Sequence, residues 1–228
     1  MLTAISNHDL LDLKLVVAGP ALLSKYGNVS KFIERDGFKI DYKVSTMLEG
    51  ESLLTSAKSV GLGVVELSAV FSELKPDVVV TVADRFETMS TAIASSFQNI
   101  PLAHIQGGEV TGSIDEKVRH SITKLSDIHL VSSQDAFDRV YNLGESEETI
   151  FNTGCPSIDI AKDVLEDSQL DFNPFKKYGG VGEIFDYNKY LVVLQHPVTT
   201  EHGESFFQAE QTLLAVSYTH LTLPTISD

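Results

Sequence analysis

Short apolar runs alternate along the chain with longer stretches in which apolar residues recur at helical spacing. The short runs predict buried strands, and the stretches between them predict helices. The expected strands are Leu13–Ala18, Ile40–Val44, Asp77–Val82, Leu102–Ile105 and Ile128–Ser132. The expected helices are Pro20–Asp36, Ser52–Leu74, Phe86–Gln98, Ile114–Ser126 and Asp135–Leu143. Repeated strand–helix units indicate an α/β domain built on a parallel, doubly wound sheet.

The clearest strand is Asp77–Val82, which is nearly continuous in β-branched residues. Such a run is typical of a strand covered on both faces.

The amino-acid composition of the chain changes after Asp163. Residues 167–188 are rich in Gly, Asp and Asn and predict the end of a helix and a connecting segment, and Tyr190–Leu194 then predicts a new buried strand. We therefore expect a first domain over residues 1–180, and a linker with the beginning of a second domain over 181–215. Residues 216–228 resemble the translation of a sequencing adapter, and we expect them not to be native.

The amino-acid composition limits which classes of binding partner and which cellular compartment we expect. The chain has 228 residues, 43% of them hydrophobic, and 17 basic against 32 acidic residues give a net charge of −15. That balance argues against nucleic acid or an anionic membrane as a partner, although it permits a small anionic substrate. The single cysteine, Cys155, excludes an intramolecular disulfide and is expected to be buried. No apolar run of about 20 residues and no signal peptide is visible, so we expect a cytoplasmic protein.

Polar side chains follow the strand Asp77–Val82, where an open α/β sheet binds its ligands. Arg85 could hold phosphate or sugar hydroxyls through its planar fork, and Asp84 could accept a hydroxyl or act as a base. In the alternative interpretation, Asp84 caps the following helix and pairs with Arg85.

A second group follows the strand Leu102–Ile105. Gly107 and Gly108 allow a sharp turn or a close approach to a ligand, and Glu109 would project into the cleft as an acid or base. The alternative is a surface turn with a solvated carboxylate. His104 lies inside the strand and is interpreted as a packed neighbour.

A third group begins the next helix. Ser113 and Glu116 fit a capping box. Asp115 and Arg119 are four residues apart, as are Glu116 and His120, so each pair shares a helix face. If that face meets the cleft, it supplies two carboxylates, a cation and an imidazole.

His196 follows the strand of the expected second domain, where it would face an interdomain cleft or else be a turn residue before a proline. The sequence has no HExxH pair, no Walker loop and no GxGxxG motif, so no metal site is expected.

Several of these segments together resemble the hydrolysing UDP-N-acetylglucosamine 2-epimerases, which serve bacterial sialic and nonulosonic acid synthesis and form part of an animal bifunctional enzyme. The resemblance runs from Leu13 to Thr200. The segments that carry it are Lys75–Asp77, Ala83–Thr88, Asn99–Glu116, Arg119–Lys124, Gly154–Ser157 and Leu194–Thr200.

The resemblance implies a Rossmann-like N-terminal half of a two-domain glycosyltransferase-B-like fold, with a UDP-sugar between the domains. It implies removal of the C2 proton with loss of UDP, and then addition of water to a glycal to give N-acetylmannosamine, without a cofactor. The implied acid–base residues are Asp84, Glu109, Asp115 and His196. The implied substrate-binding residues are Arg85, Gly107, Gly108, Glu116, Arg119 and His120.

The chain departs from the family at both ends. By that resemblance, we expect the chain to begin after the first strand of the family and its basic loop, and to lack most of the second domain. We therefore expect the full gene product to be the enzyme, as a homodimer or larger oligomer, and this chain to be inactive. The alternatives are a hydrolase and 2-epimerase of UDP-2,4-diacetamido-trideoxy sugars, a glycosyltransferase, or a non-catalytic module that binds sugar nucleotides.

Overall fold

The computed structural model describes residues 1–48, 50, 52–112, 114–167, 172–173, 176–177, 179, 193–196 and 203–216. The chain divides into two compact units, Met1–Ile158 and Asp159–Asp228. The domain boundary expected at residue 180 and the tail 217–228 lie outside the described residues, and both stay predictions.

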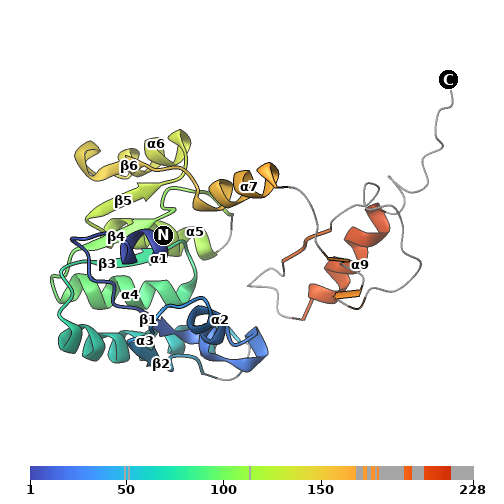
Figure 1. Ribbon diagram of the computed structural model, residues 1–228, viewed down its shortest axis with the longest axis horizontal. Coiled ribbons are helices and arrows are strands. Elements are labelled where there is room, and N and C mark those ends of the chain that lie inside the picture. The colour runs from blue at the N-terminus through green and yellow to red at the C-terminus, as the bar shows by residue number, and fades with distance from the viewer. Residues whose placement is uncertain are drawn as a thin grey trace. The chain divides into compact units, whose positions relative to one another are not determined.

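The first unit is an α/β structure in which all strand pairs are parallel, as Figure 1 shows. Strands β1 (Val16–Ala18) and β2 (Tyr42–Val44) form a two-stranded sheet. A four-stranded sheet follows in chain order, with strands β3 (Val79–Val82), β4 (Leu102–Ile105), β5 (Ile128–Val131) and β6 (Ile150–Asn152). The parallel α/β class is confirmed, although the strands divide between two sheets.

Helices connect successive strands of the first unit. The α-helices of this unit are α1 (Leu2–Ser6), α2 (Val29–Arg35), α3 (Leu53–Leu74), α4 (Phe86–Phe97), α5 (Ile114–Leu125) and α6 (Gln134–Asn142). Helix α7 (Pro156–Glu166) begins in the first unit and continues into the second. Three short 3₁₀ helices are η1 (Gly19–Leu22), η2 (Ser24–Tyr26) and η3 (Glu147–Thr149).

The prediction of one helix over Pro20–Asp36 is wrong, because that stretch breaks into η1, η2 and α2. Gly27 and Asn28 both adopt positive φ, at +87° and +50°, which ends one helical segment before the next begins.

Strand β3 is covered on one face only, contrary to the expectation from its β-branched run. Val79 and Thr81 are buried, whereas Val80 and Val82 are 38% and 39% exposed. Val79 lies in the core shared with α3, α4 and α5, whereas Val80 and Val82 point to the opposite face of the sheet. The next strand, β4, is buried at all four residues, as a continuous apolar run predicts.

The main core lies between the helices α3, α4 and α5 and the strands β2, β3 and β4. Its buried residues are Val44, Leu67, Val70, Phe71, Val79, Ala92, Ala94, Leu102, Val118 and Ile122. A smaller cluster joins β5, α6 and β6 through Val131, Ala136, Val140 and Ile150. This packing fixes the carboxyl ends of β3, β4 and β5 next to the start of α5.

The expectation that no stretch is long and apolar enough to span a membrane is corrected by helix α3. By length and composition alone this helix could cross one, because Lys58, Glu66 and Glu73 interrupt it only sparsely. It also packs along α4 and buries Leu67, Val70 and Phe71 in the core, so it is weak support for a membrane span.

In the second unit the structure describes helix α9 (Ser205–Val216), which was not predicted. Of the expected strand Tyr190–Leu194, only Val193 and Leu194 belong to the described residues, and these two form no strand.

Candidate active site

Two residues in the left-handed backbone conformation mark the carboxyl ends of β3 and β4. The strands end side by side at Val82 and Ile105. The next residues, Ala83 and Gln106, have φ of +61° and +62°. A non-glycine residue in this region costs about 1–3 kcal/mol and persists where the surroundings enforce it, often at functional sites. Both polar loops therefore leave the sheet through strained and closely held residues.

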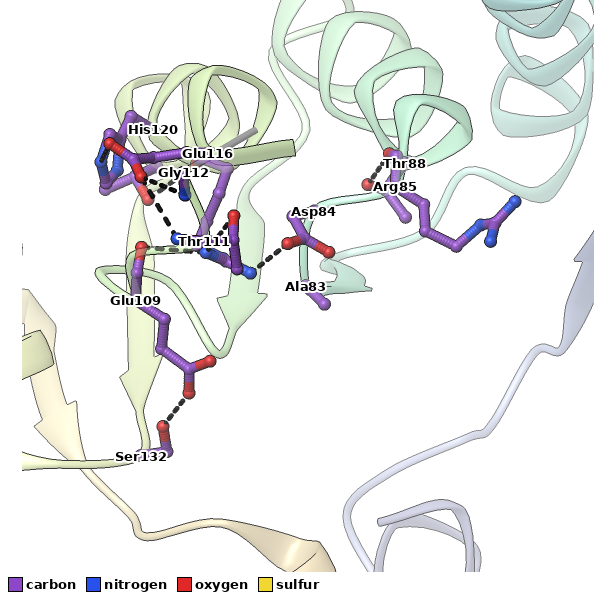
Figure 2. Close-up of polar contacts among 12 residues, drawn as sticks. Ala83, Asp84, Arg85, Thr88, Glu109, Thr111, Gly112, Glu116, His120 and Ser132 are labelled. Carbon is purple, nitrogen blue, oxygen red and sulfur yellow. Dashed lines mark hydrogen bonds and ion pairs between the residues drawn. The ribbon is translucent and has the colours of Figure 1, made fainter. Parts of the chain in front are cut away.

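Asp84 turns from the end of β3 toward α5, where its carboxylate is paired with the guanidinium of Arg119. Figure 2 shows the Asp84 carboxylate with a dashed line to this partner, and it shows Arg85 directed away from Asp84. The side chains of Asp84 and Arg119 are 17% and 4% exposed. Helix α4 has no side-chain cap. The alternative in which Asp84 caps that helix and pairs with Arg85 is therefore wrong.

Arg119 also fixes the loop between β4 and α5. Its Nη1 donates to the carbonyl oxygen of Glu109 at 2.9 Å and lies 3.5 Å from the hydroxyl of Thr111. The Arg119 guanidinium thus contacts both polar loops, through Asp84 after β3 and through Glu109 after β4. Its role as a substrate-binding group stays a prediction, and in this structure it joins the two polar loops.

The glycine pair after β4 is explained by close packing. A Cβ on Gly107 would lie 3.0 Å from both the His104 ring and the Thr123 hydroxyl, and one on Gly108 would overlap the carbonyl oxygen of Ala136. Arg139 donates to the carbonyl oxygen of Gly108 at 2.9 Å. The pair lets the loop lie against α5 and α6, while substrate contact by its backbone stays a prediction.

Glu109 extends from this loop toward the end of β5, where its carboxylate accepts a hydrogen bond from the hydroxyl of Ser132. The side chain is partly buried and points away from Glu116 in Figure 2. Glu109 therefore has a defined hydrogen-bond partner. The alternative, a surface turn with a solvated carboxylate, does not predict such a partner.

Glu116, in the first turn of α5, folds back onto the chain before the helix. Its carboxylate accepts from the backbone N–H groups of Gly112 at 2.9 Å and Thr111 at 3.2 Å. These bonds, that of Gly112 first, lower the pKa of Glu116. The expected partner in a capping box, Ser113, lies outside the described residues. His120 Nε2 is 3.9 Å from the Glu116 carboxylate, so this predicted pair shares a helix face.

Arg85 is the most exposed cation of the site, with 63% of its side chain exposed. It donates to Glu87 through Nε at 3.2 Å and Nη2 at 2.8 Å, and this pairing raises its pKa. Asp115 adds a weaker electrostatic contribution in the same direction. The geometry leaves Arg85 able to exchange Glu87 for an anionic ligand.

The predicted site residues of the first unit thus lie on the loops after β3 and β4 and on helix α5, with Arg85 directed away from Asp84. His196 belongs to the second unit and is exposed. Sequence reasoning missed Ser132, although it follows β5 as Asp84 follows β3, and the same strand-end rule would have found it. Cys155 is half-buried rather than buried, and the amide of Gln106 lies 3.5 Å from its Sγ. Among the described residues, no group of three or more His, Cys, Asp or Glu side chains is placed to hold a metal ion.

Comparison with known proteins gives a consistent match. Residues 3–226 match the family described as UDP-N-acetylglucosamine 2-epimerase. A UDP-N-acetylglucosamine 2-epimerase of Neisseria meningitidis is 33% identical over 202 residues, 88% of this chain and 51% of that protein. A hydrolysing UDP-N,N'-diacetylbacillosamine 2-epimerase of Legionella pneumophila is 34% identical over 224 residues, 98% of this chain and 58% of that protein. The chain spans about half the length of these relatives.

Solved structures show the same fold. The UDP-GlcNAc 2-epimerase of Neisseria meningitidis bound to UDP-GlcNAc aligns with a TM-score of 0.62 at 19% identity, over 73% of this chain and 45% of that one. The enzyme of Methanocaldococcus jannaschii in complex with UDP-GlcNAc and UDP aligns with a TM-score of 0.65 at 18% identity, over 78% and 48%. The parallel α/β unit is therefore the counterpart of about half of a fold of the glycosyltransferase-B type.

Proposed function

This chain belongs to the UDP-N-acetylglucosamine 2-epimerase family, and we propose that the full-length protein is a hydrolysing 2-epimerase that converts UDP-N-acetylglucosamine and water to N-acetylmannosamine and UDP. The observation that carries the proposal is the group formed at neighbouring strand ends by Glu109 with Ser132 and by Asp84 with Arg119. The hydrolysing type is supported by the relatives from Legionella pneumophila and Campylobacter jejuni, whose names include it.

In the first step a carboxylate removes the proton at C2 of the sugar. The C1–O bond breaks, UDP leaves with its electron pair, and a C1–C2 double bond forms. In the second step water adds at C1 and gives one proton to a side-chain base, while a protonated side chain delivers a proton to C2 from the other face. The reaction therefore needs an acid–base set and help for the departing diphosphate.

We assign the acid–base set to Asp84, Glu109, Asp115 and His196. Glu109 accepts a hydrogen bond from Ser132 and keeps a second carboxylate oxygen for a substrate proton. Arg85 is exposed and able to hold the diphosphate, and His120 lies beside Glu116 on the same helix face. The elimination and hydration draw on these side chains alone, so no cofactor is part of the proposal.

A second sugar is also supported. Two relatives carry names that specify N,N'-diacetylbacillosamine, a sugar with two acetamido groups, and they are 34% and 38% identical to this chain. The same elimination would act on such a substrate, because the proton at C2 and the diphosphate at C1 are unchanged.

The proposal is tested with the full-length protein and no sugar acceptor. Release of UDP together with N-acetylmannosamine supports it. Release of UDP only from the diacetamido sugar keeps the reaction and changes the substrate. A glycosyltransferase would release UDP only with an acceptor, and a non-catalytic module would bind either sugar without releasing UDP. We also propose that the full-length protein is cytoplasmic. We propose that it forms a homodimer or larger oligomer, and analytical ultracentrifugation tests this oligomeric state.

A further inference from the structure

His104 is a buried histidine at the third position of β4, and it lies under the candidate active site without being part of it. Its side chain is 0% exposed. It pairs in register with Thr81 of β3 and with His129 of β5. A histidine in this position would be an ordinary core residue, but its two ring nitrogens both contact segments that carry site residues.

The first contact joins His104 to the loop that presents Asp84. His104 Nε2 lies 2.8 Å from the carbonyl oxygen of Ala83. A carbonyl oxygen only accepts hydrogen bonds, so Nε2 carries a proton and donates it. The N–H group of Ala83 donates to Ile105 at 2.9 Å. Two consecutive residues of β4 therefore hold both polar groups of Ala83.

These two hydrogen bonds matter because Ala83 adopts the left-handed backbone conformation, with a φ of +61°. An alanine leaves this conformation unless its surroundings enforce it. The residue stands directly before Asp84, so its backbone conformation sets the direction in which the Asp84 carboxylate leaves β3. Without the bond from His104, the peptide after Ala83 would be free to rotate, and Asp84 would lose its alignment with Arg119.

The second contact joins His104 to α5. His104 Nδ1 lies 3.3 Å from the hydroxyl of Thr123, which also lies 3.0 Å from the carbonyl oxygen of Arg119. With Nε2 protonated, Nδ1 of the neutral ring is an acceptor, and it shares the single Thr123 hydroxyl proton with the Arg119 carbonyl oxygen in a three-centre contact. Burial lowers the pKa of His104 to about 4, and the nearby cation of Arg119 acts in the same direction. The neutral ring therefore persists across the physiological range of pH.

We propose that His104 is a positioning residue of the active site, which holds Ala83 in its left-handed conformation and so aims the carboxylate of Asp84. The ring joins the end of β3 to helix α5, and Gly107 leaves the space that the ring and Thr123 occupy. His104 touches no substrate in this account and acts only through Ala83 and Thr123. The kinetic part of the proposal rests on the proposed epimerase function.

The first experiment reads the protonation state of His104 in the wild-type protein. Histidine labelled with ¹⁵N in the full-length protein reports the tautomer of His104, whose signals are assigned by their loss in His104→Gln. We expect a protonated Nε2, an unprotonated Nδ1 and no titration between pH 5.5 and 8. A protonated Nδ1, or a charged ring at neutral pH, would overturn the proposal, whether or not the protein is an epimerase.

The second experiment compares two neutral amides. The Gln amide reaches the position of Nε2 and can donate to Ala83, whereas the shorter Asn amide reaches only that of Nδ1. We expect His104→Asn to lower kcat by about 10- to 100-fold with little change in KM, and His104→Gln to keep kcat within about threefold. Equal activity of the two variants would contradict the positioning role.

His129→Gln is the matched control, because it changes the other buried histidine of the same sheet, which contacts Glu145 at 3.4 Å instead of a site loop. We expect this variant to lose stability and to keep the kcat of wild type. If the full-length wild type releases no UDP from either sugar, the proposed function fails, and the tautomer measurement still decides the placement of His104.

Discussion

The carboxylate of Asp84 pairs with the guanidinium of Arg119, which lies 35 residues further along the chain, and both side chains are largely withdrawn from water. A buried ion pair adds little net stability, since each charge loses its hydration, but removal of one partner leaves the other charge uncompensated. The pair therefore makes the site dependent on Arg119, a residue that does not have to touch the substrate.

The variant Arg119→Met tests this dependence. We expect it to lower the free energy of unfolding by roughly 3–5 kcal/mol, because the carboxylate of Asp84 stays buried without its partner. Urea unfolding of the chain measures the change. Arg85→Met is the control, because this arginine is exposed and pairs with Glu87 at the surface, and it should change stability by less than about 1 kcal/mol. Equal effects of the two variants would contradict the account.

The two glycines of the β4–α5 loop that have positive φ should differ sharply in their tolerance of alanine. A Cβ on Gly108 overlaps the carbonyl oxygen of Ala136, whereas one on Gly112 meets nothing within 4 Å. Gly112→Ala adds only backbone strain of about 1 kcal/mol, and Gly108→Ala should cost at least about 2 kcal/mol more. Thermal unfolding of the two variants provides the comparison, and similar melting temperatures would count against the packing described for Gly108.

We expect the free energy of unfolding to fall in mild acid because of the buried His104. Its pKa is lowered from 6.5 to about 4 in the folded chain, chiefly by burial. The unfolded chain therefore binds the proton first as pH falls, so the stabilisation is complete above about pH 6.5 and is lost between about 6.5 and 4. The loss should approach roughly 3 kcal/mol.

The pH dependence is measured by urea unfolding at several values from pH 7.5 to 4.5, in wild type and in His104→Gln. Carboxylates contribute similarly to both proteins, so the difference between the two curves isolates the histidine. The difference should change by at least about 1 kcal/mol over this range. Parallel curves would show that His104 does not titrate as the structure predicts.

Ser132 should support catalysis through its bond to Glu109. The loss of a hydrogen bond to a charged group costs about 1.5–3 kcal/mol, so Ser132→Ala in the full-length protein should lower kcat by about 10- to 100-fold. Ser121→Ala is the control, because its exposed hydroxyl donates to the backbone carbonyl oxygen of Lys117 within α5. Unchanged kcat in Ser132→Ala would remove Ser132 from the site.

Apolar periodicity predicted the parallel α/β class and most element positions. The strand Leu102–Ile105 was predicted with its observed bounds, because it is buried along its whole length and its composition reflects that environment. Strand β6 and helix α7 were not predicted. The strand has only three residues, of which Phe151 and Asn152 are exposed, and α7 buries none of its described residues, so neither leaves a clear apolar pattern.

The site was predicted as a set of residues but not as a set of contacts. The positions of Asp84 and Glu109 follow from the strand ends they occupy. Their partners Arg119 and Ser132 lie 35 and 23 residues away, and local pattern rules reach only about four residues along a helix. The glycine pair was predicted to allow a sharp turn or a close approach to a ligand, and the ligand contact stays a prediction. The packing of the pair against α5 and α6 depends on helix positions that the sequence does not reveal.

The most direct test of the epimerase account is turnover of UDP-N-acetylglucosamine by the full-length protein in deuterated water, in wild type and in Glu109→Gln. The account predicts that wild type releases UDP and N-acetylmannosamine with deuterium at C2, because the original C2 proton is removed and replaced from solvent. It predicts that Glu109→Gln, which keeps the shape of the side chain without its charge, makes no such product. Product without deuterium, or an equally active variant, would contradict the elimination mechanism or the role of Glu109.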